Sequence, residues 1–277
     1  MNSTCAKAPY RHRVMLLPHR PILSRLSSNS SGGTTASRRE LTIRMRRPCL
    51  ALCTLLAAAS LAASASEVGR AEPDACVQVF VRKAEDLRRR HQALIESASD
   101  TGPKVLQGLG QHDQAIRALI RQARQACSSA STDEAIGSVL QLMHLIDGSN
   151  QRLLRSVLQS QGWPSSAVWG AEVADAAFLI VQHADQDPSL QEQGLALLEP
   201  LVNSGEAPGD EFALLFDRIR VNANKPQRYG TQGRCQGKSW KPLRLENAAG
   251  VDALRAAVGL SPLAEYAAVA SQLGCQH

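Results

Sequence analysis

The feature that most constrains the fold of this chain is a succession of segments in which apolar residues recur every three or four positions. This spacing places apolar side chains on one face of a helix, which then packs against a neighbour. The segments are residues 74–97, 113–127, 131–146, 151–161, 171–183, 187–202, 211–221, 248–258 and 262–273. No stretch of comparable length alternates apolar and polar residues as a half-buried strand does. The sequence therefore predicts an all-α fold.

The first two segments predict a helical hairpin. They are separated by a break in the sequence DTGPK, Asp100–Lys104. Two helices joined by a short connection pack antiparallel. We therefore expect a hairpin domain over residues 66–130 and a compact multi-helix domain over residues 131–277. Within the second domain, the sequence DGSN at residues 147–150 is expected to end one helix before the next begins.

One polar stretch of the second domain fits no helix. It runs from Asn222 to Leu245 and holds the sequence KPQRYGTQ, residues 225–232. A loop of this length inside a compact domain is more often functional than idle. We expect one long irregular loop here, with room for a short β-hairpin around Tyr229 or Trp240.

The N-terminal residues have the composition of a leader. A short cationic start at Met45, MRRPC, precedes the apolar run LALCTLLAAASLAA at residues 50–63, and Ala63-Ser64-Ala65 supplies the small residues after which a signal peptidase cleaves. The apolar run is short for a membrane span. We therefore predict a signal peptide over residues 45–65 and a periplasmic or secreted protein without a retained membrane span. Residues 1–44 are expected to be disordered or an over-extended start of the reading frame, with an organellar transit peptide as the alternative.

The net charge of +6 comes from the leader rather than from the body. Residues 1–66 hold ten of the 31 Lys and Arg but only one of the 25 Asp and Glu. The remaining chain has 21 cations against 24 anions, a net charge of −3. A mildly acidic body offers no electrostatic surface for phosphate backbones, so the sequence argues against nucleic acid as a partner.

Four cysteines follow the leader: Cys76, Cys127, Cys235 and Cys275. An even number in an exported chain indicates two disulfides, with three possible connectivities. Cys76 opens the first predicted helix and Cys127 closes the second, so both lie at the open end of the hairpin. We favour a bond between these two, which leaves Cys235 with Cys275. No closely spaced set of Cys and His indicates a zinc site, and we expect neither a metal nor a cofactor.

Charged residues near two helix ends are the candidates for chemistry. His183 ends an apolar helix, and with Asp185 it would form a proton-transfer pair; the alternative is a histidine stabilised by the helix dipole. Asp217 and Arg218 lie in the last turns of another apolar helix. Arg218 either pairs with Asp185 or Asp217 and joins two helices, or receives an anionic ligand.

Polar residues of the loop are the candidates for ligand binding. Gln227 and Gln232 have donors and acceptors but no useful pKa, and Tyr229 and Thr231 flank Gly230, which permits a tight turn. This set suits a neutral polar ligand such as a sugar or a peptide. In the alternative, both Gln side chains bond backbone groups and hold the loop in place.

Several short motifs occur in a fixed order. They are GWP at 162–164, QHADQDP at 182–188, DRIRVNANKPQRYGTQ at 217–232, VDALR at 251–255 and GLSPLAEY at 259–266. This combination resembles the bacterial family known as domain of unknown function 6624, over residues 147–266. The resemblance implies membership but no chemistry. One departure is Ala223-Asn224, where we expect a Gly-containing turn.

Three functions remain open. The one we favour is an exported helical protein that binds a small polar ligand or envelope component through the charged residues and the loop. The second is a cell-envelope hydrolase in which His183 is the acid or base and Asp185 or Asp217 orients it. The third is a structural or protein-interaction module. The sequence holds no phosphate-binding Gly loop, serine-hydrolase elbow or His-Glu-x-x-His motif. Catalysis requires His183 beside a carboxylate and open to a pocket, whereas ligand binding requires the loop side chains to face a cavity.

Overall fold

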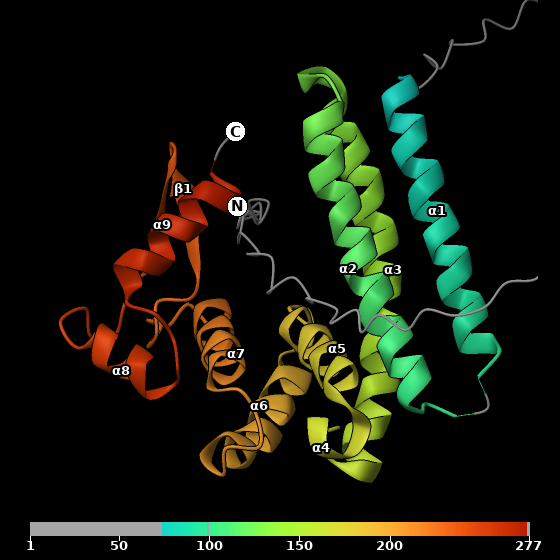
Figure 1. The fold of residues 1–277 in the computed structure, drawn as a ribbon. Helices are drawn as coiled ribbons and strands as arrows, with labels where there is room; N and C mark the ends of the chain where they lie inside the picture. Colours follow the sequence, from blue (N-terminus) through green and yellow to red (C-terminus); the bar gives the residue numbers. More distant parts are fainter. Residues whose placement is uncertain (1–73, 99, 276–277) are drawn as a thin grey trace, which may run out of the picture. The chain divides into compact units, whose positions relative to one another are not determined.

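The computed structural model describes residues 74–98 and 100–275, which contain nine helices and one two-stranded sheet (Figure 1). These residues all lie in one compact unit. None of their helices has both the length and the hydropathy of a transmembrane span. The signal peptide predicted at residues 45–65 and the extension at residues 1–44 lie outside the described residues.

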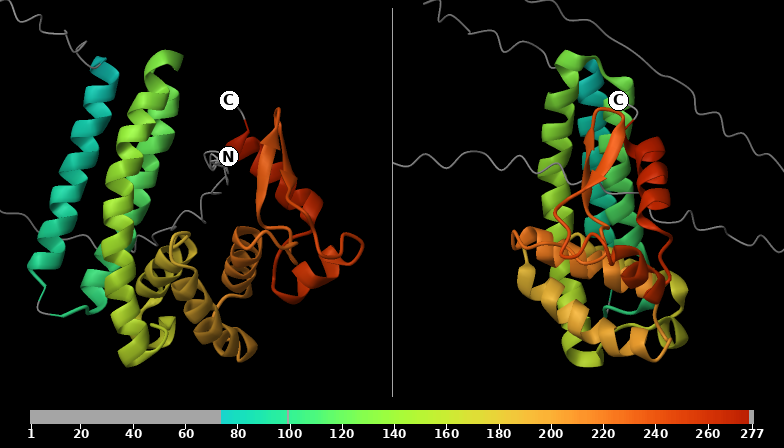
Figure 2. Two further views of the ribbon diagram at one scale, coloured as in Figure 1. Left: turned by 180° about the vertical axis from the view of Figure 1, so that it is seen from behind. Right: turned by 90° about the vertical axis from the view of Figure 1, so that its left-hand side faces the viewer.

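Three long helices form the first part of the fold: α1 (Ala75–Glu96), α2 (Pro103–Ala126) and α3 (Ser129–Gln161). Each packs against the other two, and they run along one another in Figure 2. Their shared core consists of buried apolar side chains: Val77, Phe80, Ala84, Leu87, Ile116, Leu119, Ala123, Ala135, Val139 and Ile146. The predicted hairpin of the first two helices is therefore present, with α3 packed onto it.

α2 begins ten residues before the start that the apolar spacing predicts. Pro103 occupies its first turn, where the missing N–H has no consequence because the first N–H groups of a helix have no partner within it. Gly102 is the cap residue. The added turns carry Leu106 and Leu109, whose side chains are fully buried. The connection between the two helices is thus short, as the predicted hairpin requires.

α3 is one continuous helix of 33 residues, and the break predicted at residues 147–150 is wrong. Tertiary contacts hold this segment in the helix. Asp147 pairs with the buried Arg117 of α2, and the Ser149 hydroxyl is 2.7 Å from His91 Nε2 on α1. The buried face of the segment therefore outweighs the low helix propensity of its Asp, Gly, Ser and Asn.

Four helices follow: α4 (Ser166–Trp169), α5 (Ala171–Gln182), α6 (Pro188–Asn203) and α7 (Gly209–Asn222). α5 packs closely on α2, because a Cβ atom at Gly110 would lie only 2.5 Å from the Cβ of Ala176. α6 packs against α5 and α7. The core around α5 includes Leu106, Leu109, Leu154, Phe178, Ile180, Leu190 and Leu215. The helices predicted in this part are confirmed, whereas α4 is not predicted by the sequence.

The C-terminal part holds the strands β1 (Gly233–Gln236) and β2 (Ser239–Pro242) and the helices α8 (Val251–Ala257) and α9 (Leu263–Gly274). The strands are antiparallel and pair Cys235 with Trp240. Trp240 is buried in a small core with Ala270 and Cys275. The β-hairpin expected within the irregular region therefore lies at Trp240, and the fold is mostly helical with one long irregular loop.

Asn224 explains how the chain departs from the expected Gly-containing turn. Its φ is 56°, in the left-handed region that favours Gly and that Asn tolerates better than most residues. The turn is therefore formed with Asn in the position that suits Gly.

Both disulfides have the pairing favoured from the sequence. Cys76–Cys127 joins the start of α1 to the residue after α2. Cys235–Cys275 joins β1 to the residue after α9. One bond thus closes the helical hairpin and the other closes the C-terminal part of the fold.

Candidate functional site

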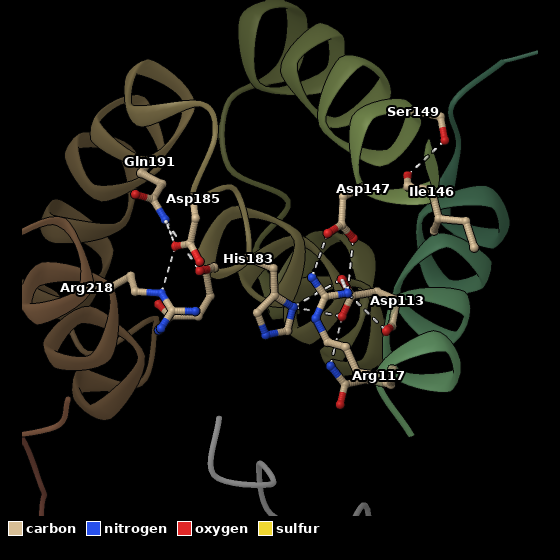
Figure 3. A network of polar contacts seen from close by, with 11 residues as sticks. Asp113, Arg117, Ile146, Asp147, Ser149, His183, Asp185, Gln191 and Arg218 are labelled. Carbon is tan, nitrogen blue, oxygen red and sulfur yellow. Dashed lines mark hydrogen bonds and ion pairs between the residues drawn. The ribbon is translucent and has the colours of Figure 1, made fainter. Parts of the chain in front are cut away.

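His183 lies directly after α5 and is the residue that caps it. Its Nδ1 atom is 2.9 Å and 3.1 Å from the two carboxylate oxygens of Asp113, which comes from α2 (Figure 3). The His183 residue is only 6% exposed and Asp113 only 1%. The carboxylate beside His183 is therefore not Asp185, as the sequence suggests, but a residue seventy positions earlier in the chain.

Arg117 fixes the position of Asp113. It lies one helical turn further along α2, and its Nη1 atom is 2.7 Å from Asp113 Oδ1. The same guanidinium group donates to both carboxylate oxygens of Asp147 on α3, at 3.0 Å and 2.9 Å. A bidentate Arg–carboxylate pair is among the strongest and most directional side-chain contacts. Three helices therefore contribute to the orientation of the His183 ring.

A second ion pair lies on the other side of His183. Arg218 Nε is 2.9 Å from Asp185 Oδ1, and the Asn222 side chain donates to the same oxygen at 2.9 Å. Arg218 Nη1 donates to Gln232 Oε1 at 3.2 Å. The expected pairing of Arg218 with a carboxylate thus occurs, with Asp185 as the partner. Figure 3 shows the His183 ring between this pair and the Arg117 pair.

The charges around His183 favour its neutral form. Burial lowers the pKa of the His183 imidazole, Asp113 opposes this shift, and the positive charges of Arg117 and Arg218 add to the effect of burial. Burial would raise the pKa of Asp113, but attraction from His183 and Arg117 outweighs it, and the pKa is lowered. The result is an ionised Asp113 that accepts a hydrogen bond from Nδ1–H of a neutral imidazole.

Asp217 has a different surrounding and a different role. It is fully buried on α7, and the backbone N–H groups of Arg228, Tyr229 and Thr231 donate to its carboxylate at 2.7 Å, 3.0 Å and 2.9 Å. The Thr231 hydroxyl adds a fourth hydrogen bond at 3.0 Å. Burial raises the pKa of Asp217, although these hydrogen bonds act in the opposite direction. The Asp217 carboxylate therefore holds the loop against the helix and is not beside His183.

The polar side chains of the loop are likewise engaged with the fold. Gln227 donates to the carbonyl oxygens of Gln232 and Leu243 at 2.7 Å and 3.0 Å, and its Oε1 accepts from the backbone N–H of Gln232 at 2.8 Å. The Tyr229 ring is buried against Phe212 and Phe216. These contacts match the alternative in which the loop residues hold the loop in place.

The structure brings in three charged residues that the sequence reasoning missed: Asp113, Arg117 and Asp147. A signal for the first was present, because Asp113 lies four residues after Leu109 and three before Ile116, inside the apolar face of α2. A charged residue on a buried face implies a buried partner. Asp147 was hidden by the predicted end of the helix at residues 147–150.

Two of the cavities in the described part of the chain lie away from this cluster. One, of about 440 Å³, is formed around Trp169 and the connection between α1 and α2. The other, of about 160 Å³, includes Trp163, Asp175 and Glu211, and burial together with repulsion from Asp175 raises the pKa of Glu211 to about 8. Neither cavity includes His183. Within residues 74–98 and 100–275, no group of three or more His, Cys, Asp or Glu side chains has a geometry that would hold a metal ion.

These observations define a mostly helical, disulfide-containing protein with a buried cluster of His, Asp and Arg. The chain belongs to a family of unknown function, DUF6624, whose model matches residues 104–273. The match begins earlier than the resemblance in the motifs suggests, and it includes the part of α2 that carries Asp113 and Arg117. Searches of curated proteins and of solved structures find no match.

Proposed function

We propose that this protein is a hydrolase of the cell envelope in which His183 is the general base and Asp113 orients it. The observation that carries the proposal is the hydrogen bond of 2.9 Å between His183 Nδ1 and Asp113. A carboxylate at Nδ1 fixes the tautomer in which Nε2 has the free lone pair, and it stabilises the imidazolium that forms when Nε2 takes a proton. The two disulfides support a location outside the reducing cytoplasm.

We take His183 Nε2 and Arg218 Nη2 as the atoms that would contact a substrate. Neither makes a hydrogen bond to any residue in the described part of the chain, and neither is among its sealed, unpaired polar atoms. In the proposed reaction, Nε2 removes a proton from water as the water oxygen bonds to the substrate's electrophilic carbon. Arg218 stabilises the negative charge that develops on the substrate oxygen. The bond between the carbon and the leaving group then breaks, and the proton on Nε2 passes to that group.

Binding without turnover is the second candidate. The low exposure of His183, 6%, and its position outside both cavities argue against access by a large substrate. In that case His183 Nε2 and Arg218 would contact a small polar ligand. The loop residues Gln227, Tyr229 and Gln232 would act indirectly, by holding Arg218 and Asp217 in place.

The test begins with an NMR titration of the His183 imidazole in the full chain. We expect a pKa below the ordinary value of about 6.5 and a ¹⁵N signature of the Nδ1–H tautomer. A panel of chromogenic esters and amides then measures turnover, and His183→Gln should lower kcat/KM by about 10²-fold or more. Asp113→Asn should lower kcat and change its pH profile, because the amide no longer fixes the tautomer.

His144→Gln is the matched control, because His144 is an exposed histidine on α3. It should leave both the turnover and the titration of His183 unchanged. Turnover that survives in a folded His183→Gln variant would refute the catalytic proposal. A ligand that binds the wild type but is never turned over, and that shifts only the His183 and Arg218 signals, would replace it with the binding function.

A further inference from the structure

A second region with the properties of a binding site lies away from His183. The connection between α1 and α2, the last turns of α3 and the short helix α4 surround an open cavity of about 440 Å³. Figure 1 shows these three segments at the same end of the long helices. Small-molecule sites in proteins have volumes of about 300–1,000 Å³. The cavity is therefore large enough for one small ligand, or for one unit of a longer chain.

Most of the polar side chains that line this cavity are not used by the fold, although the Ser160 hydroxyl donates to the carbonyl oxygen of Ser156 at 2.8 Å. Asp100, Thr101, Ser156 and Gln161 form no side-chain hydrogen bond or ion pair with any residue in the described ranges. The long loop is the opposite case, because there both amide groups of Gln227 and Gln232 are bonded within the protein. Donors and acceptors from two segments of the chain, residues 100–101 and the end of α3, therefore line one space without a side-chain hydrogen bond to the described residues.

Trp169 gives the cavity an aromatic wall. Its side chain packs partly against the core around α5, which restrains the indole, and it also lines the cavity. A restrained indole offers a flat apolar face beside an N–H donor. A ligand that suits this wall has one apolar face and a polar edge.

The charge of the residues that line the cavity limits the kind of ligand that it can bind. Asp100 is the one charged residue among the lining residues, so the cavity contributes no cation toward a phosphate or a carboxylate. The hydroxyl groups of a ligand can donate to the Asp100 carboxylate, and they can both donate to and accept from the Ser156 hydroxyl and the Gln161 amide. We propose that this cavity binds a saccharide unit, with Trp169 against the apolar face of the sugar ring and Asp100, Ser156 and Gln161 bonded to its hydroxyl groups.

The test uses the indole N–H signals of the full chain in ¹⁵N-correlated NMR spectra. The protein has three tryptophans, and the other two are internal controls, because Trp163 lines the second cavity and Trp240 is buried beneath the β-hairpin. Trp169→Phe identifies the Trp169 signal by its loss. Titration with glucose, galactose and N-acetylglucosamine should move the Trp169 signal in a saturable manner and leave the other two in place.

Two variants test whether the shift of the Trp169 signal depends on the residues that line the cavity. Asp100→Asn and Gln161→Ala, both at exposed positions, should each weaken binding of the responding sugar by about tenfold, as expected for the loss of one good hydrogen bond. Glu134→Gln, an exposed change on α3 far along the sequence from the cavity, should have no effect. If no sugar moves the Trp169 signal, the proposal fails. It also fails if ethylammonium moves the signal in an Asp100-dependent way while the sugars do not, because the cavity would then be a cation site. Neither result depends on His183, so the proposed hydrolase function is tested separately.

Discussion

The buried His91 and the half-buried His112 form a pair whose protonation should control the stability of the first three helices. Their Nδ1 atoms are 3.3 Å apart, and His91 Nε2 is 2.7 Å from the hydroxyl of Ser149 on α3. Burial, with repulsion from His112, lowers the pKa of His91 to about 4. Burial also lowers the pKa of His112, and Arg90 adds to this shift. One ring must donate to the other, which is possible only while at least one of them is neutral.

The pH dependence follows from the sign of these shifts. Because the folded pKa of His91 lies below its unfolded value, the unfolded chain binds more protons between about pH 6.5 and about pH 4. The free energy of unfolding should therefore be highest above this range and fall as the pH decreases through it. Thermal unfolding across the range should show a smaller decrease for His91→Gln than for the wild type. An equal decrease in both proteins would mean that other groups cause the acid sensitivity, and His144→Gln is again the exposed control.

The candidate site could be predicted only in part from single residues of the sequence. His183, Asp185, Asp217 and Arg218 were recognisable as charged groups at the ends of apolar helices. Their partners were less accessible, because the partner of His183, Asp113, is seventy residues away and is set by how α2 packs on α5. No local spacing encodes that distance.

At the scale of elements, the long helix α3 gives a stability prediction. Gly148 lies inside this helix, and a Cβ atom there would meet only the Nη1 atom of Arg152, at 3.8 Å. Gly148→Ala should therefore stabilise the protein by about 0.5–1 kcal/mol, because Ala loses less conformational freedom in a helix. Chemical denaturation measures the change.

Gly110→Ala is the matched contrast. Gly110 is also helical, but its new Cβ atom would lie 2.5 Å from the Cβ of Ala176, so α2 and α5 would have to separate. We expect a loss of about 1–3 kcal/mol, the usual effect of overpacking. If both variants were stabilised alike, the close packing of α2 on α5 would be incorrect.

Apolar spacing predicted most of these elements, and it failed where tertiary contacts override local preference. α2 begins early because Pro103 is acceptable in the first turn of a helix. The sequence DTGPK at residues 100–104 was instead interpreted as a break, so this start was missed. The continuity of α3 depends on the buried ion pair of Asp147 with Arg117, which no window of neighbouring residues contains. The helices α5, α6 and α7 follow local apolar patterns and were predicted correctly.

At the scale of the whole molecule, the two disulfides restrain separate parts of one chain. The sequence separations they close are 51 residues for Cys76–Cys127 and 40 for Cys235–Cys275. On the chain-entropy model, each bond contributes up to about 4 kcal/mol by restricting the unfolded chain. Replacing either pair by Ser should lower the free energy of unfolding by a similar amount, as measured by denaturant unfolding without reductant.

The region of the fold that loses stability should differ between the two disulfide variants. Loss of Cys76–Cys127 should increase hydrogen exchange in α1, whereas loss of Cys235–Cys275 should increase it in α9 and the β-hairpin. Reductant should reproduce both effects in the wild type and add nothing in a variant without either pair. A wild type that is unaffected by reductant under these conditions would show that the disulfides do not contribute to stability.

The contacts of Asp217 determine which substitutions the loop at residues 225–232 can accept during evolution. Three of its four hydrogen bonds come from backbone N–H groups, so they persist whatever side chain stands at position 228. The same positions cannot accept proline, which has no N–H to donate. The side chain at position 228 can therefore vary without loss of this hydrogen bond, whereas a change at Asp217 removes the acceptor for all four donors at once. Among related sequences, substitutions should therefore occur mainly at the outward-facing side chains of this loop. The backbone conformation of the loop should stay the same wherever the Asp217 carboxylate is retained.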